Sequence, residues 1–202
     1  MTSRHPIRFL AIEGADGVGK STVLRLLLPK LVQSGGFSGY AFFHWKPIRD
    51  SFHFDEIPAD DPHDPRAKDP RLPILSLVFL ARHWIQYQVG YWRRVRPALR
   101  TGRLVVADRY TYDVALDPTR FRLRLPAWVL RLFVRTLPRP DAAILLTAPP
   151  DVIHARKSEL SEAEISAYQT ALCSCQVIRR PVHIDASPTP MEIVSSIVQH
   201  FP

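Results

Sequence analysis

The sequence is poor in cysteine and contains no long apolar run. Its two cysteines, Cys173 and Cys175, are too few and too close together for a disulfide framework or a zinc site, so we expect reduced thiols in a cytoplasmic protein. The longest apolar stretch, residues 72–81, ends at Arg82 and is too short to cross a bilayer, so we expect no membrane partner. The histidines show no spacing typical of metal ligands.

Negative charge is scarce relative to positive charge. The 202 residues include 27 Lys and Arg against 19 Asp and Glu, a net charge of +8, which favours anionic partners such as nucleotides or phosphorylated metabolites. A basic cluster at residues 93–103 follows Tyr91 and Trp92, and it is either a solvated helix face or a groove for phosphate or nucleic acid. The same aromatic residues continue an apolar helical stripe, which favours core packing and makes nucleic acid the less favoured partner.

Apolar runs alternate with helical patterns along the chain. This alternation predicts one three-layer α/β domain over residues 1–202, with a mostly parallel five-stranded sheet and helices on both faces. A stretch rich in Pro and Asp at about residues 55–73 predicts a flexible loop. The five expected strands cover residues 7–12, 39–45, 103–107, 142–147 and 182–185.

A glycine-rich segment follows the first expected strand and fits the pattern G-x-x-x-x-G-K-[ST]. We call residues 14–21 the phosphate loop. Glycines let successive backbone N–H groups turn toward phosphate oxygens, and the N-terminus of the following helix adds a partial positive charge. We therefore expect ATP to bind here, with Lys20 on its β- and γ-phosphates and the Ser21 hydroxyl on Mg²⁺. The expected nucleotide-binding residues are Gly14, Ala15, Asp16, Gly17, Val18, Gly19, Lys20, Ser21 and Thr22.

A second candidate site begins where the strand at residues 103–107 ends. Ligands gather at the carboxyl ends of strands in open α/β sheets, so Asp108 is placed to hold Mg²⁺ and Arg109 to bind a phosphate with its planar fork. The alternative is a plain ion pair between these two neighbours at the end of the strand.

Three stretches of the chain resemble the thymidylate kinase family of nucleoside monophosphate kinases, within the P-loop NTPases. Residues 9–22 are similar to the family's phosphate loop, including Asp16. The triplet Asp108-Arg109-Tyr110 is similar to its DR[YH] motif. Residues 139–152, followed by Ala155-Arg156, are similar to the strand and helix that lead into its lid. The segment Trp45-Lys46-Pro47 is also similar to that of a divergent thymidylate-kinase-like group associated with bacterial surface-polysaccharide genes.

The resemblance implies roles for individual residues. Asp16 would accept a hydrogen bond from a sugar hydroxyl of the phosphoryl acceptor, and Arg109 would bind its phosphate. Phe79 would stack on the acceptor's base. Arg156 would be the catalytic cation of a short mobile lid at about residues 154–164. The other expected acceptor-binding residues are Trp45, Lys46, Arg82 and Tyr110.

The chain also departs from the family pattern in the acceptor region. The family's Arg-Glu-Pro segment is here Trp45-Lys46-Pro47, without the acid. The family's base-reading arginine comes four residues after the stacking aromatic, where this chain has His83, and Arg82 is one residue early. On a helix, one residue turns the side chain by about 100°. A further run, Arg120, Arg122 and Arg124 alternating with apolar residues, is either a surface strand or a loop near the acceptor.

These observations favour a kinase that transfers the γ-phosphoryl group of ATP to a small acceptor, best a nucleoside monophosphate such as thymidylate. Two alternatives stay open: a kinase for a sugar or another small metabolite, and a non-catalytic module that binds ATP or nucleic acid. Aromatic residues at positions 74–92 pack either the monomer core or, as in related kinases, a homodimer.

Overall fold

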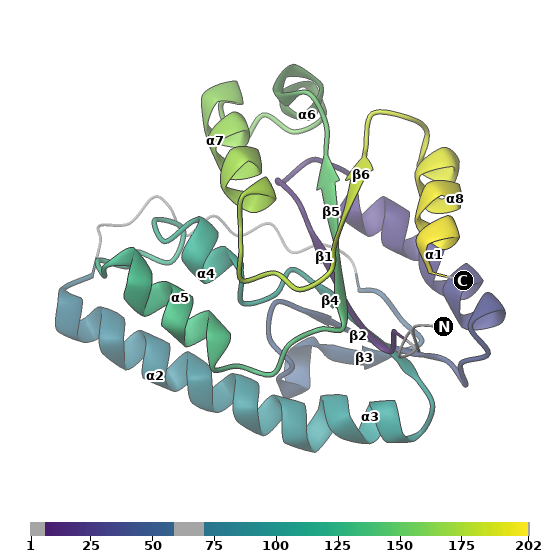
Figure 1. Cartoon of the computed structure of the whole chain (residues 1–202), viewed down its shortest axis with the longest axis horizontal. Helices are drawn as coiled ribbons and strands as arrows, with labels where there is room; N and C mark the ends of the chain where they lie inside the picture. The colour runs from purple at the N-terminus through teal and green to yellow at the C-terminus, as the bar shows by residue number, and fades with distance from the viewer. Residues whose placement is uncertain (1–6, 59–70, 202) are drawn as a thin grey trace.

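The computed structural model describes residues 7–58 and 71–201 of the chain. Part of the loop expected at residues 55–73, namely residues 59–70, lies outside the described residues. The described chain forms one α/β domain in which a twisted sheet runs through the centre and helices cover it (Figure 1).

Six strands form the sheet in the order β3-β2-β4-β1-β5-β6. All neighbouring strands are parallel except β3, which runs antiparallel to β2. β1 lies between β4 and β5, so chain segments far apart in sequence meet at its carboxyl end. The strands are β1 (Phe9–Glu13), β2 (Tyr40–His44), β3 (Phe52–Phe54), β4 (Leu104–Asp108), β5 (Ala142–Thr147) and β6 (Pro181–Asp185).

The central strands form where the sequence is apolar without interruption. Every residue of β1 and of β4 is buried, as expected for strands covered on both faces. Their parallel register sets Ile12 beside Asp108. The phosphate loop after β1 and the acid that ends β4 are therefore neighbours because of strand pairing alone.

The sequence analysis missed β3, so the sheet has six strands rather than five. This strand has only three residues and directly follows a 3₁₀ turn at Arg49–Ser51, which leaves no run long enough to recognise. Its place in the sheet is fixed by tertiary packing: the ring of Phe52 stacks on Phe43 of β2, with centroids 5.9 Å apart.

Helices cover both faces of the sheet. α1 and α8 pack together on one side, and α2, α3 and α5 lie on the other (Figure 1). Among the described helices, none is both long and apolar enough to cross a membrane. The helices are α1 (Lys20–Ser34), α2 (Pro73–Gly90), α3 (Arg96–Arg100), α4 (Asp113–Leu116), α5 (Ala127–Arg135), α6 (Pro150–Arg156), α7 (Glu162–Cys173) and α8 (Pro190–His200).

Candidate active site

The phosphate loop joins β1 to α1 and turns sharply at glycines. Gly17 and Gly19 have φ angles of 89° and 101°, which L-residues with a side chain rarely adopt. A Cβ atom on Gly17 would also lie 2.8 Å from the Cβ of Lys157. The loop is therefore closed and is tightly packed at Gly17, where it lies next to the segment that follows α6.

Lys20 is the first residue of α1, and its side chain is buried in the loop. Its Nζ donates hydrogen bonds to the carbonyl oxygens of Gly14 and Ala15, each at 3.0 Å. Burial, followed by the positive charge of Arg109, lowers the pKa of Lys20, although Asp108 and Asp16 act in the opposite direction. The ammonium group is therefore fixed against the backbone of the phosphate loop, close to other charged side chains.

Asp108 ends β4 and is almost fully buried. Burial alone would raise its pKa, but the neighbouring His44 and the charges of Lys20 and Arg109 outweigh burial and hold the pKa below its usual value. One carboxylate oxygen lies 3.6 Å from Nδ1 of His44, and the other, Oδ1, is buried without a hydrogen-bond partner among the described residues. A buried carboxylate oxygen in this state suits a hard cation.

Arg109 is the centre of a buried charge network. Its guanidinium donates to Asp113 at 2.8 Å, to the hydroxyl of Tyr168 at 3.3 Å and to Asp16 at 2.6 Å. It therefore pairs with these two acids and not with its neighbour Asp108. Its backbone has a φ of 62°, a strained conformation for a non-glycine residue, and its side chain reaches Asp16 in the phosphate loop.

Four residues of this network were missed by the sequence analysis as site residues. Asp113 begins α4, and one of its oxygens accepts a 2.7 Å hydrogen bond from the hydroxyl of Tyr168 on α7. Glu13 is buried and accepts from the backbone N–H of Tyr110 at 2.7 Å, and burial together with the negative charge of Asp113 raises its pKa. Arg120 contacts Asp16 at 2.8 Å. No local motif marks Asp113 and Tyr168, because only the fold brings α4 and α7 together. Arg120 lies in a turn beside Asp16, which agrees with the second alternative for its run, a loop near the acceptor.

An aromatic cluster, made of Trp45, Phe79, His83 and Phe121, lies between the segment after β2 and helix α2. Trp45 stacks on Phe121 with centroids 4.9 Å apart, and Phe79 stacks on His83 at 3.8 Å. The Nζ of Lys46 lies 4.2 Å from the centroid of the Trp45 ring and 3.3 Å from Nε2 of His83. Trp45 itself has a φ of 58°, so a second left-handed non-glycine residue marks the end of a strand at this site.

His83 belongs to the aromatic cluster, whereas Arg82, which was expected to bind the acceptor, points away from it. The side chain of His83 is buried, whereas Arg82 is exposed on α2, as one residue of helical rotation requires. Burial and the nearby charge of Lys46 lower the pKa of His83 to about 4. Burial and the charge of Arg82 lower the pKa of Lys46 to about 8. At neutral pH the imidazole is uncharged, and the ammonium group keeps its proton.

The segment expected to form a lid packs beside the phosphate loop. Arg156, the last residue of α6, donates hydrogen bonds to the carbonyl oxygens of Ala186 at 3.1 Å and Val18 at 3.5 Å. The helix after this segment, α7, starts with a capping box between Ser161 and Glu164. These contacts place Arg156 at the nucleotide end of the site; that the segment moves stays a prediction.

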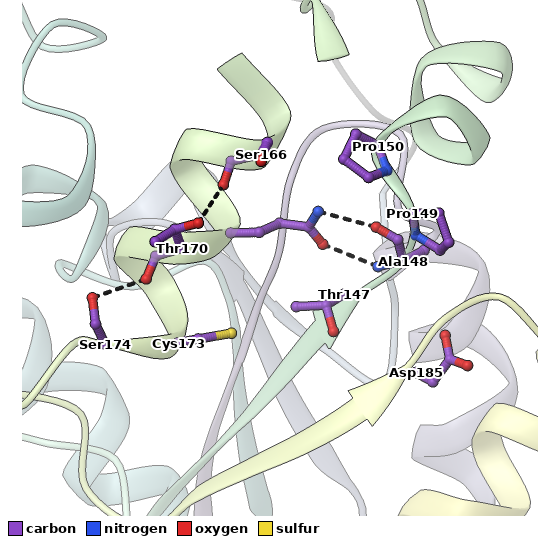
Figure 2. A pocket seen from close by; sticks show the side chains of 10 residues that line it. Thr147, Ala148, Pro149, Pro150, Ser166, Thr170, Cys173, Ser174 and Asp185 are labelled. Atoms are coloured by element: carbon purple, nitrogen blue, oxygen red, sulfur yellow. Dashed lines mark hydrogen bonds between the residues drawn. The ribbon is translucent and has the colours of Figure 1, made fainter. Parts of the chain in front are cut away.

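An open hollow lies at the carboxyl ends of β5 and β6, against α7 (Figure 2). Ala148, labelled in Figure 2, is held from both sides: its N–H donates to Oε1 of Gln169 and its carbonyl accepts from Nε2, each at 3.0 Å. This pair of hydrogen bonds fixes α7 to the end of β5. It thereby positions the adjacent Tyr168 against Arg109 and Asp113.

The relatives found by comparison with known proteins share one name. A comparison with models of protein families finds no match. A protein of Pyrobaculum aerophilum named probable thymidylate kinase is 29% identical over 210 residues, which cover 95% of this chain and 94% of the relative. The thymidylate kinase of Methylococcus capsulatus is 32% identical over 156 residues, 72% of this chain and 66% of the relative. The thymidylate kinase of a Synechococcus species is 28% identical over 206 residues, with 96% and 94% covered.

The similarity extends over nearly the whole length of two of these relatives, so it includes both the phosphate loop and the β4 end of the site. The parallel sheet, the closed glycine loop and the neighbouring Asp108 and Arg109 agree with this similarity. The chain belongs to the thymidylate kinase family, as a divergent member.

Proposed function

We propose that the protein transfers the γ-phosphoryl group of ATP to thymidylate, which gives ADP and thymidine diphosphate. The observation that carries the proposal is the placement of a closed phosphate loop directly beside Asp108 and Arg109, with the aromatic cluster attached to the same strand end. The backbone N–H of Trp45 donates to the carbonyl oxygen of Asp108 at 2.9 Å. The names of the relatives support thymidylate as the acceptor.

ATP would occupy the phosphate loop, with its β- and γ-phosphates on the loop amides and on Lys20. Asp108 and Ser21 would hold Mg²⁺. Mg²⁺ usually keeps several waters and takes few protein ligands beside the substrate phosphates, which fits the unpartnered oxygen of Asp108. No group of three or more His, Cys, Asp or Glu side chains gathers in a metal-binding arrangement within residues 7–58 and 71–201, so a more extensive protein cage is not offered there. When bound, Mg²⁺ neutralises charge on the phosphate oxygens of ATP.

Thymidylate would bind between Arg109 and the aromatic cluster. Its phosphate would meet Arg109, and its base would lie against Phe79 and Trp45. Nδ1 of His83 lies 2.9 Å from the carbonyl oxygen of Phe79, so in neutral His83 this nitrogen donates and Nε2 is the acceptor. Lys46 beside it is a donor. In the structure Nε2 already faces Nζ of Lys46 at 3.3 Å, so thymine would take the place of this contact: its O4 would accept from Lys46 and its N3–H would donate to Nε2. In this arrangement Lys46 and His83 would take the role of the arginine in the family pattern.

The reaction would be a direct in-line transfer. An oxygen of the acceptor's phosphate attacks the γ-phosphorus, the bond to the β,γ-bridging oxygen breaks, and ADP leaves with those electrons. The attacking oxygen is already ionised, so no strong general base is needed and catalysis consists of positioning and charge stabilisation. Lys20, Arg109 and Arg156 would be the cations around the phosphates.

The test is a coupled assay of ADP release with Mg²⁺ and ATP and a panel of acceptors: nucleoside monophosphates, nucleosides and sugars. We expect release that depends on thymidylate, and we expect Lys20→Ala to reduce kcat at least about 1,000-fold, because a charge that is fixed at the transferring group is lost. ADP release that depends on a sugar would mean that the acceptor is that sugar and not thymidylate. Oligonucleotide binding that weakens with salt, without any acceptor-dependent release, would favour a non-catalytic module.

We also propose that the protein is a homodimer formed through the outer face of α2. This face exposes a stripe of apolar side chains at helical spacing, and α5 adds Trp128, which is 66% exposed. The aromatic residues of α2 divide between two surroundings, since Tyr87 is buried in the core while Trp84 faces outward. The stripe consists of Ile74, Leu77, Val78, Ile85 and Val89.

A further inference from the structure

The carboxylate of Asp16 is held by two arginines, one on each oxygen. Nη2 of Arg109 lies 2.6 Å from Oδ1, and Nη1 of Arg120 lies 2.8 Å from Oδ2. The sequence pattern identifies only the first of these arginines. Two guanidinium groups converging on one small anion is the arrangement that binds phosphate as readily as carboxylate.

Arg120 approaches the site from the acceptor side. It belongs to the turn after α4, where Oδ1 of Asp117 accepts from the backbone N–H of Arg120 at 3.1 Å. The next residue, Phe121, stacks on Trp45 in the aromatic cluster. One turn therefore carries both a wall of the proposed base site and the second guanidinium.

Arg109 would keep an acid partner if Asp16 were released. Arg109 already has a fully buried partner in Asp113, whose side chain is 1% exposed, and this pair is complete without Asp16. The side chains of Asp16 and Arg120 are 21% and 18% exposed, so they meet at the edge of the site, where a ligand can reach them. An entering phosphate could exchange with the Asp16 carboxylate, because its oxygens accept the same hydrogen bonds.

We propose that Arg120 is a second residue that binds the acceptor's phosphate, and that the Asp16 carboxylate occupies the phosphate position until the acceptor arrives. The proposal rests on the proposed function, since it needs an acceptor with a phosphate group. On acceptor binding, Asp16 releases both guanidinium groups and becomes available to a sugar hydroxyl. Arg109 and Arg120 then contact the phosphate from two sides.

The test compares Arg120→Gln with Arg124→Gln, an exposed arginine four residues further along the same segment that carries the same change in charge. We expect Arg120→Gln to raise the KM for thymidylate about 10- to 100-fold, as for the loss of a charge-assisted hydrogen bond, and to leave the KM for ATP unchanged. Arg124→Gln should leave both unchanged. If the two variants behave alike, the proposal is wrong.

Inhibition by thymidine, which lacks the phosphate, separates direct binding from an effect through Asp16. We expect the inhibition constant of thymidine to be the same in the wild type and in Arg120→Gln. Equal weakening of thymidine and thymidylate would show that Arg120 acts only through Asp16, and would overturn the proposal. Should Arg120→Gln fail to fold, Arg120→Lys keeps a charge but loses the planar fork, and it should show a smaller rise in the same KM alone.

A phosphate titration keeps this proposal separate from the identity of the acceptor. With ADP and Mg²⁺ saturating the phosphate loop, inorganic phosphate should raise the melting temperature of the wild type more than that of Arg120→Gln. Asp16→Asn removes the internal competitor, so phosphate should bind this variant several-fold more tightly. Equal shifts in the wild type and Arg120→Gln, or no gain in Asp16→Asn, would contradict the proposal even if thymidylate is phosphorylated. If thymidylate is not phosphorylated, the proposed function fails, while these shifts still decide the role of Arg120.

Discussion

At the scale of single residues, the site is defined by charged groups that are buried and mutually paired. Arg109 directly follows β4, Asp113 lies on α4 and Tyr168 lies on α7, and the three are joined by hydrogen bonds. Burying a charge without a partner costs several kcal/mol, so such a set is stable only when complete. This is why the strained φ of Arg109 is tolerated: the network fixes the side chain in one position.

The uncharged state of His83 gives a prediction about pH. Its pKa is about 4 in the folded protein and about 6.5 in the unfolded chain, so between these values the unfolded chain binds the proton and the folded protein does not. The stabilisation is therefore present above pH 6.5 and is lost as the pH falls toward 4. Between pH 7 and pH 5 we expect His83 to account for a loss of about 2 kcal/mol in the free energy of unfolding.

Urea unfolding at both pH values measures this loss. His83→Gln should remove that part of the pH dependence, whereas His183→Gln, at an exposed position on β6, should retain it. The same loss in His83→Gln as in the wild type would mean that the imidazole is not buried in its neutral form.

At the scale of elements, the acceptor region depends on a close contact between α2 and the segment after β2. The last residue of α2, Gly90, lies against Pro47: a Cβ atom added to Gly90 would be 2.7 Å from Cγ of Pro47 and closer still to its carbonyl oxygen. The hydroxyl of Tyr87 on the same helix donates to the carbonyl oxygen of Trp45. α2 therefore fixes the backbone that carries Trp45 and Lys46.

Gly90→Ala tests this contact against helix propensity. Gly90 is interior to a continuous helical stretch, because the π-helical turn Tyr91–Val95 and then α3 directly follow α2. At such a position alanine normally stabilises the helix by about 1 kcal/mol relative to glycine. Here we expect the opposite, a loss of about 1 to 3 kcal/mol from overpacking, together with a higher KM for thymidylate because Pro47 and Lys46 are displaced. Chemical denaturation and the coupled assay measure the two effects. Gln33→Ala, at an exposed position of α1 away from the proposed interface, serves as the control, and stabilisation by Gly90→Ala would refute the contact.

Element prediction from the sequence succeeded where the local signal was long and regular. The apolar runs of β1, β4 and β5 and the leucine pattern of α1 identified the strands and helix that frame the phosphate loop. The three-residue β3 was missed, because its position depends on Phe52 packing against Phe43. The four-residue helix α4, which carries Asp113, was also missed because it is too short for a periodic pattern.

At the scale of the whole molecule, the outer face of α2 predicts the oligomeric state. We expect light scattering after size exclusion to give the wild type a mass about twice 23.1 kDa. The double variant Val78→Glu/Ile85→Glu should have a mass of 23.1 kDa, because dimerisation would bury its new charges in an apolar interface. Leu26→Glu on α1, the opposite side of the sheet, should leave the dimer intact. A monomeric wild type at micromolar concentration would contradict the proposal.

The sequence by itself determined the α/β class, the phosphate loop and the pair at residues 108–109, because each depends on neighbours in the chain: apolar periodicity, glycines at fixed spacing, and polar residues directly after a buried strand. Only the tertiary structure decided that His83 rather than Arg82 faces the aromatic cluster, and that Arg120, Asp113 and Tyr168 join the site. These residues lie on separate elements, and what places them is the helical rotation of α2 and the docking of α4 and α7 at the carboxyl end of the sheet. No pattern of nearby residues in the chain encodes those distances.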